Sequence, residues 1–123
     1  MAKPRRRVGG PRVRPGARRA VLVLSAYPKR AAAEKAARAL VEGRLVACAT
    51  VAPGARAFYR WEGALRRDSS VLLWGKTSAA RAREAVEAIR AGHPDRVPEI
   101  LVIPIGGGHR PYLIWLFREV RRR

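Results

Sequence analysis

The 123-residue chain is long enough for one domain with a single hydrophobic core but not for two. It carries 27 basic and 9 acidic residues, a formal net charge of +18, and its hydrophobic share of 48% argues against general disorder. Such charge suits phosphate or anionic lipid, although a coding bias toward arginine would also produce it. The single cysteine, Cys48, excludes an intramolecular disulfide and a multi-cysteine metal site within one chain.

Residues 1–19 form a basic leader rich in proline and glycine. They carry eight basic groups, no acid and no apolar periodicity. We expect a disordered arm that adheres to polyanions without sequence preference. The apolar run AVLVLSA that follows is too short for a secretory signal, and no run approaches the roughly 18 apolar residues of a membrane span. We therefore expect a cytoplasmic protein with no membrane partner.

Beyond this arm, strands and helices alternate. Short β-branched runs predict strands, and apolar stripes at helical spacing predict amphipathic helices. Gly43 and Ser78 are expected to cap the end of the first helix and the start of the second. In chain order, the predicted elements are a strand at 20–26, a helix at 31–42, a hairpin over 45–77, a helix between Ser78 and Gly92, a strand at 98–105 and a helix at 111–120.

The hairpin is predicted to be long and kinked. Pro53 and Gly54 interrupt its first strand as a bulge or bend would, and Glu62-Gly63 is expected to form its turn. Pro104 cannot donate a ladder hydrogen bond, which places the last strand at a sheet edge or puts the proline at a strand end. The glycine-rich GGGH segment before the last helix is interpreted as a hinge, with an anion cradle as the alternative.

Two βα units around a hairpin predict an α+β, ferredoxin-like βαββαβ domain over residues 20–120, with an extra C-terminal helix and a basic tail at 121–123. Right-handed crossovers place both of its first helices on one sheet face. The strands LVACATV, SVLLW and EILVIPI are nevertheless apolar on both sides. We therefore expect the last helix, neighbouring subunits or both to cover the second face.

Tyr59 and Trp61 lie two apart on a strand and point the same way. Large amphipathic rings suit a subunit interface, where we expect both to pack. The alternative is a basic nucleic-acid-binding module, because RNA-recognition motifs share the strand and helix order. Their aromatic signature is missing from the third strand, SSVLLWGKT. No phosphate loop or nucleophile–histidine arrangement indicates an enzyme.

Four ordered blocks, ACATVAPGARAFYRWEG, LLWGKT, HPDRVPEILVIPI and YLIWL, resemble the CutA divalent-cation-tolerance family over residues 20–118. The resemblance implies a ferredoxin-like homotrimer in which long hairpin strands pair between subunits. It also implies tolerance or binding of copper and other divalent cations, and no enzymatic reaction. The family's trimer looks like that of the PII nitrogen-signalling proteins, which implies small-molecule sensing at clefts between subunits.

Carried over block by block, the resemblance predicts which residues lie at a ligand or interface cleft. His93 and Glu99 are the candidate metal ligands. Lys76, at a strand end, either extends its ammonium group into solvent or, in an interface cleft, neutralises Glu99 or holds an anionic ligand, and the resemblance favours the cleft. From its surroundings alone, Cys48 is interpreted as a small core residue and His93 as a helix-capping residue. The full set is Cys48, Tyr59, Trp61, Lys76, Thr77, His93, Glu99, Tyr112 and Trp115.

Three positions depart from the family pattern. Many members have glutamate where Ser70 stands and tyrosine where Asp95 stands, and a copper-binding relative has cysteine at Ser25. Losing a carboxylate and a thiol argues against a specific soft-metal site for copper and leaves weak divalent binding open.

Overall fold

The order of strands and helices is the one expected from the sequence. The computed structural model describes residues 18–122. Its elements are β1 (Ala20–Tyr27), α1 (Arg30–Glu42), β2 (Cys48–Trp61), β3 (Ala64–Ser78), α2 (Ala79–Gly92), β4 (Ile100–Ile105) and α3 (Arg110–Glu119). The strands form one antiparallel sheet in the order β2-β3-β1-β4, which confirms the ferredoxin-like α+β prediction. Apart from Arg18 and Arg19, the expected basic arm lies outside the described residues.

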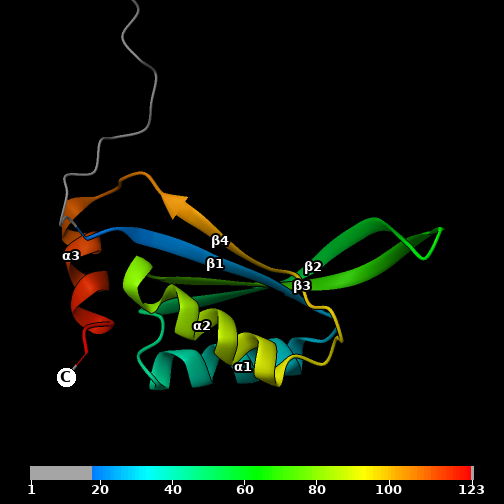
Figure 1. Ribbon diagram of the computed structural model, residues 1–123, viewed down its shortest axis with the longest axis horizontal. Coiled ribbons are helices and arrows are strands. Elements are labelled where there is room, and N and C mark those ends of the chain that lie inside the picture. The colour runs from blue at the N-terminus through cyan, green and yellow to red at the C-terminus, as the bar shows by residue number, and fades with distance from the viewer. Residues whose placement is uncertain (1–17, 123) are drawn as a thin grey trace, which may run out of the picture.

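Helices α1 and α2 lie side by side on one face of the sheet (Figure 1). In α1, Ala33, Ala37 and Leu40 are buried at the spacing of one helical stripe, so this face packs on the strands. Val23 of β1 and Leu73 of β3 are fully buried beneath the helices. This layer is the main hydrophobic core, and it confirms that both crossovers place their helices on the same side.

The two expected helix caps differ in detail from the prediction. Gly43 is the C-cap of α1 at an ordinary φ of −80°, whereas Arg44, the next residue, takes the left-handed φ of 57°. Ser78 is the N-cap of α2, but its hydroxyl makes no capping hydrogen bond. The N–H of Ala79, the first residue of α2, donates to the Arg19 carbonyl at 2.8 Å, so the segment just before β1 satisfies one of the free backbone donors at the start of the helix.

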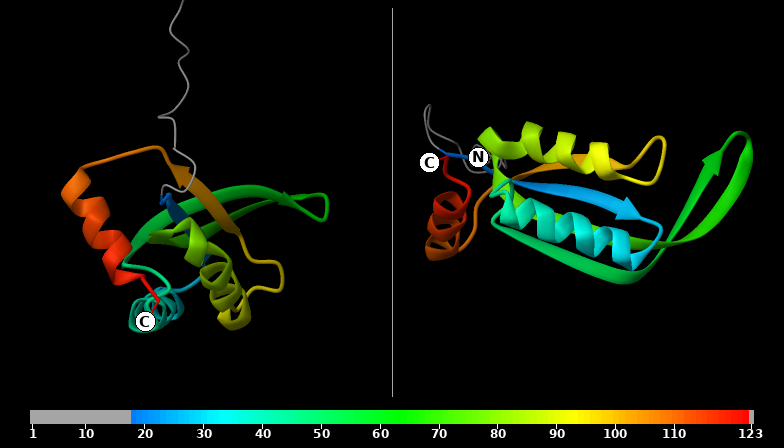
Figure 2. Two further views of the ribbon diagram at one scale, coloured as in Figure 1. Left: turned by 60° about the vertical axis from the view of Figure 1, so that its left-hand side comes forward. Right: turned by 90° about the horizontal axis from the view of Figure 1, so that it is seen from below.

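The β2–β3 hairpin is long and kinked as predicted, and it extends well beyond the helical layer (Figure 2). Glu62 and Gly63 both have positive φ, 49° and 81°, as a two-residue hairpin turn with the favoured twist requires. The pairing register shifts between Ala52 and Ala55, where Gly54 also has a positive φ of 89°. This bulge lets the hairpin bend without losing its ladder.

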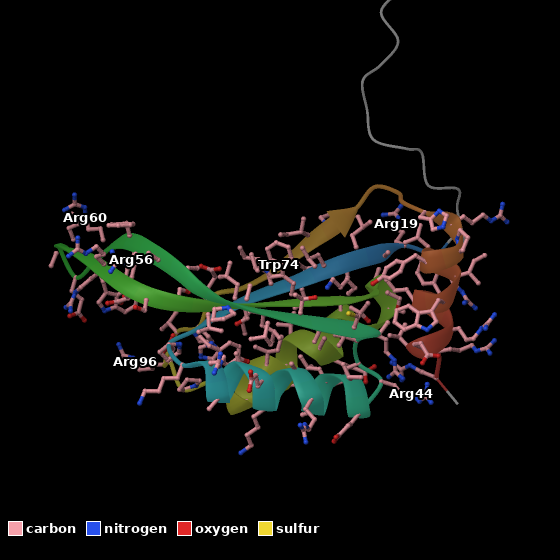
Figure 3. The ribbon with its side chains drawn as sticks, turned by 180° about the vertical axis from the view of Figure 1, so that it is seen from behind. Arg19, Arg44, Arg56, Arg60, Trp74 and Arg96 are labelled. Carbon is pink, nitrogen blue, oxygen red and sulfur yellow. The ribbon has the colours of Figure 1, made fainter. Side chains whose placement is uncertain are left out.

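Helix α3 covers one end of the sheet and leaves the middle of the second face open. Leu116 and Val120 pack against Ala20 and Ala47, and these four residues form a second, smaller core cluster. Over the middle of the sheet lies Trp74 of β3 (Figure 3). Trp74 and Leu101, which share one cross-strand row with Leu24 between them, remain 41% and 50% exposed. The expectation that something covers this face is therefore met only in part by the described chain.

Two strands lie at the edges of the sheet. Within residues 18–122, β2 pairs only with β3 and β4 only with β1, so each has one open edge. Pro104 lies in β4, an edge strand, as its missing N–H predicts. None of the helices in this part of the chain has the length and apolar character needed to cross a bilayer.

The close approach of β3 to the loop after α1 predicts a sensitive glycine. A Cβ on the buried Gly75 would lie 2.9 Å from Cγ1 of Val46, a buried β-branched side chain that cannot easily move. Gly75→Ala is expected to lower the free energy of unfolding by about 1–3 kcal/mol in urea denaturation. Gly92→Ala is the control, because a Cβ at that helix position meets nothing within 4 Å. Equal stability of the two variants would contradict the packing described here.

Candidate functional site

A broad concavity of about 1230 Å³ lies between the end of the hairpin and the loop that joins α2 to β4. The predicted residues Tyr59, Trp61 and Glu99 all line it, although they come from distant parts of the chain. The end of β1 closes it with Tyr27, whose ring is buried. The bend of the hairpin thus brings predicted aromatic and acidic side chains around one hollow.

Tyr59 and Trp61 share one side of β2, as their spacing predicts. The Tyr59 hydroxyl donates a hydrogen bond to the carboxylate of Asp68 on the facing strand. That hydrogen bond is the main reason why the pKa of the Tyr59 phenol is raised. Trp61 is 42% exposed at the end of the hairpin, where no other element of the described chain covers it. Two large rings are thus held on an open surface.

His93 is held by its surroundings on both sides of its ring. Its Nε2 lies 2.8 Å from the carbonyl oxygen of Ala26, and its Nδ1 accepts a hydrogen bond from the Asp95 N–H at 3.0 Å. Its ring stacks on Tyr27 with centroids 4.2 Å apart. The neutral imidazole with its proton on Nε2 satisfies both contacts. His93 is the C-cap of α2, but its side chain bonds to β1 instead of to helix carbonyls, unlike the capping interpretation.

These contacts leave His93 poorly suited to a metal. Both ring nitrogens are occupied and its side chain is fully buried, so ligation would require breaking a hydrogen bond. Glu99 is exposed, and its carboxylate makes no hydrogen bond or ion pair among residues 18–122. No group of three or more potential ligand side chains within that range is arranged to hold a metal ion. The described part of a single subunit therefore does not provide a fitting metal site.

Among the three positions that depart from the family pattern, a side-chain hydrogen bond accounts for the residue at Ser25. Ser25 is buried, and its hydroxyl donates to the Glu99 carbonyl at 2.8 Å, which joins β1 to the segment before β4. At position 95 the contact with His93 comes from the backbone N–H of Asp95, which any residue other than proline would supply. Ser70 is buried at the point where the hairpin leaves the sheet. Serine therefore serves a structural purpose at Ser25, where a thiol would make a weaker hydrogen bond.

A second group of predicted residues lies near α3, on the sheet face opposite α1 and α2. Lys76 pairs directly across from Cys48, with Nζ 3.9 Å from its sulfur and 2.5 Å from the Thr50 hydroxyl. Partial burial, with a smaller effect of the adjacent Cys48, raises the pKa of the Tyr112 phenol. Tyr112 packs on Trp115 with ring centroids 5.5 Å apart. Cys48 is half-buried and belongs to neither core cluster, so its interpretation as a core residue is wrong.

The remaining predicted contacts divide between these two groups. Lys76 and Glu99 form no ion pair within residues 18–122, because β1 lies between β3, which carries Lys76, and β4, which Glu99 precedes. Thr77 is fully buried, and its hydroxyl donates to the Leu45 carbonyl at 2.7 Å. Its contact is structural, whereas Lys76 remains available beside the open face. Sequence reasoning did not single out Tyr27 and Asp68, although each lies near a predicted strand end.

The open face does not resemble a base-stacking platform. Directly across the strands, Trp74 is flanked by Thr50 on one side and by Leu24 and then Leu101 on the other. The neighbouring row, Cys48, Lys76, Leu22 and Ile103, contains no aromatic side chain. Recognition of single-stranded RNA on a sheet relies on several rings that stack on successive bases. This composition argues against the RNA-recognition alternative on this face.

Comparison with known proteins agrees with the sequence blocks and the fold. The family model described as CutA1 divalent ion tolerance protein matches residues 21–119. The divalent-cation tolerance protein CutA of Thermus thermophilus is 42% identical over 95 residues, 77% of this chain and 92% of the relative. Two further relatives also carry the name divalent-cation tolerance protein CutA.

Solved structures show the same fold. The CutA crystal structure from Xylella fastidiosa superposes with a TM-score of 0.81 at 35% identity, covering 83% of this chain and 98% of that one. A structure from Archaeoglobus fulgidus, described as a periplasmic divalent cation tolerance protein CutA, reaches 0.80 at 27% identity, with coverage of 83% and 99%. The chain belongs to the CutA1 divalent ion tolerance family.

Proposed function

We propose that the protein acts as a homotrimer that binds divalent cations or a small ligand at clefts between its subunits and catalyses no reaction. The observation that carries this proposal is the exposed apolar centre of the second sheet face, with Trp74, Leu101 and Ile103 each 40–50% exposed. A contiguous apolar surface of this kind is typical of an interaction site. Family membership supports a role in tolerance of divalent ions rather than in a reaction.

The open edges of β2 and β4 support association between copies of this chain. Unpaired strand edges beside an apolar face expose backbone donors and acceptors that another strand can satisfy. Another copy supplies both an apolar face of the same composition and a complementary edge. The number of three subunits rests on the resemblance to the CutA family. Assembly of this kind would bury the apolar centre and pair the long hairpin strands.

The ligand cleft in this proposal forms where a neighbouring subunit closes the concavity beneath the hairpin. Tyr59 and Trp61 supply apolar surface with one polar atom each, and Glu99 supplies a carboxylate for a hard cation. The group around Lys76 offers a positive point charge for an anionic part of a small ligand. We also propose that the protein works in the cytoplasm.

Trp61 provides the most direct test of assembly. Trp61→Ala removes a large half-exposed ring from the hairpin end and is expected to weaken association by about 2 kcal/mol or more, as for an interface hot spot. Val41→Ala on α1 is the control, because Val41 is also 42% exposed but lies outside the hairpin. Sedimentation velocity over a concentration series measures the trimer fraction. An unmodified protein that sediments as a monomer would refute the proposed assembly.

Glu99 and His93 test the metal site in opposite ways. Glu99→Gln is expected to weaken Mn²⁺ binding in calorimetric titration, because it removes a negative charge from an exposed hard ligand. Glu42→Gln on α1 removes the same charge elsewhere. His93→Gln is expected to leave Mn²⁺ affinity unchanged but to cost about 1–3 kcal/mol of stability, since it disturbs two hydrogen bonds and a stack. Loss of Mn²⁺ binding in a folded His93→Gln protein would show that the ring does ligate the metal.

A further inference from the structure

An arginine groove lies at the end of the molecule where β1 begins and α3 ends. It has a volume of about 440 Å³, and half of the residues that line it are arginines from three separate segments. Arg18 and Arg19 precede β1, Arg81 lies in the first turn of α2, and Arg121 and Arg122 follow α3. We propose that this groove binds the phosphodiester backbone of nucleic acid without reading the base sequence.

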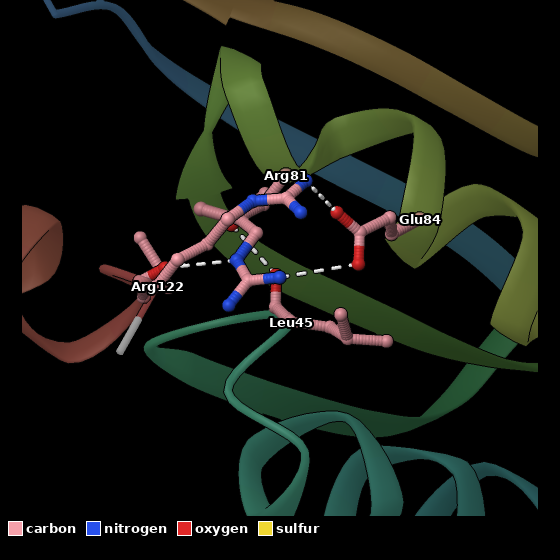
Figure 4. Close-up of polar contacts among 6 residues, drawn as sticks. Leu45, Arg81, Glu84 and Arg122 are labelled. Carbon is pink, nitrogen blue, oxygen red and sulfur yellow. Dashed lines mark hydrogen bonds and ion pairs between the residues drawn. The ribbon is translucent and has the colours of Figure 1, made fainter.

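Part of the groove is held rigidly in place. The Arg81 side chain is only 12% exposed, and its Nε donates to the Val120 carbonyl at 2.9 Å. One oxygen of Glu84 accepts from Arg81 at 3.1 Å, and the other accepts from Arg122 (Figure 4). A single carboxylate thus fixes two guanidinium groups side by side. The two guanidinium groups and this carboxylate together carry a net charge of +1, and the other three arginines of the groove add further positive charge.

The rest of the groove is free to bind an anion. Arg19 and Arg121 are exposed and form no side-chain ion pair among residues 18–122. The guanidinium of Arg18 lies 6.0 Å from the centre of the Phe117 ring. The first turn of α2 contains no acidic side chain, so the positive end of its dipole adds to the same field. Arginine is suited to this role because its planar fork can pair with two phosphate oxygens.

A nucleic acid fits the groove better than a membrane surface does. In the sequence, six more basic residues stand at positions 1–17, before Arg18, and Arg123 follows Arg122, so the segments joined to the groove residues carry further positive charge. A phosphodiester chain offers negative charge in series to match them. Attachment to a bilayer usually combines cations with inserted apolar side chains. Positions 1–17 offer only Met1, Val8 and Val13 as larger apolar residues.

This inference does not depend on the proposed trimer or its ligand cleft. The groove lies at the α3 end of the sheet, whereas the concavity lies at the hairpin, as the positions of Arg19 and Arg60 in Figure 3 show. It also goes beyond general attraction by the basic arm, because it places specific arginines of the folded domain at the phosphates. Removing these arginines should lower the affinity for nucleic acid more than removing equal charge elsewhere on the surface.

The test compares two double variants of the full chain that lose the same charge. Arg19→Ala/Arg121→Ala removes two of the three groove arginines that form no ion pair among residues 18–122, whereas Arg30→Ala/Arg38→Ala removes two exposed arginines of α1. Both keep residues 1–17, so attraction by that segment is common to them. Fluorescence anisotropy with a labelled random-sequence DNA, single-stranded and duplex, gives the affinity at several salt concentrations. Light scattering during gel filtration checks that folding and assembly are unchanged.

The groove variant is expected to lose at least about tenfold in affinity for one or both DNA forms, as expected when charge-assisted hydrogen bonds are lost. The slope of log affinity against log salt should become shallower by about two, one for each lost phosphate contact. The α1 variant should change both quantities much less. Equal losses in the two variants would overturn the proposal in favour of net charge alone. Binding to phosphatidylserine vesicles without binding to DNA would also overturn it.

Discussion

The structure depends on one geometric mismatch between the sheet and the helices available to cover it. Right-handed crossovers place α1 and α2 on one face, so only α3 remains for the other. Ten helical residues span about 15 Å, whereas the fifteen residues of β3 extend for about 50 Å. Helix α3 can therefore seal one end of the second face and no more. Leucine and tryptophan side chains in the middle of that face stay exposed to water, which is costly unless something else covers them.

The same mismatch leaves the outer part of the hairpin without a core to pack against. Beyond the bulge at Gly54, β2 and β3 leave the helical layer, so neither of their faces has a core to pack against. The aromatic residues at this end are held by the strand ladder and, for Tyr59, by its bond to Asp68. A hydrogen-bonded pair of strands on its own is marginal in water. In the proposed assembly, the concavity beneath the hairpin is half of an interface, and the proposed ligand site lies there for that reason.

Local patterns in the sequence were enough to predict the elements, the kink and the turn, because periodicity and glycine or proline chemistry act over a few residues. Contacts across long separations were not predictable in this way. The sequence predicts metal binding or helix capping for His93, whereas its ring bonds to Ala26, 67 residues away, and stacks on Tyr27. The arginine groove likewise draws on both ends of the described chain and on α2. Residue type indicates which side chains could bind a ligand or an ion, but the topology decides which of them lie close together.

The distribution of charge links the apolar face to the basic surface. Among the three central cross-strand rows of the open face, from Cys48 to Ala52 on β2, Lys76 is the only charged side chain, so association can bury this face without trapping arginines. The cost of association is instead long-range repulsion between copies that each carry +18. Repulsion between exposed charges is screened beyond about 8 Å at physiological salt and falls further when a polyanion neutralises them. The two proposals are therefore linked: binding of a polyanion at the groove would favour assembly through the apolar face, and assembly would favour that binding to the same extent.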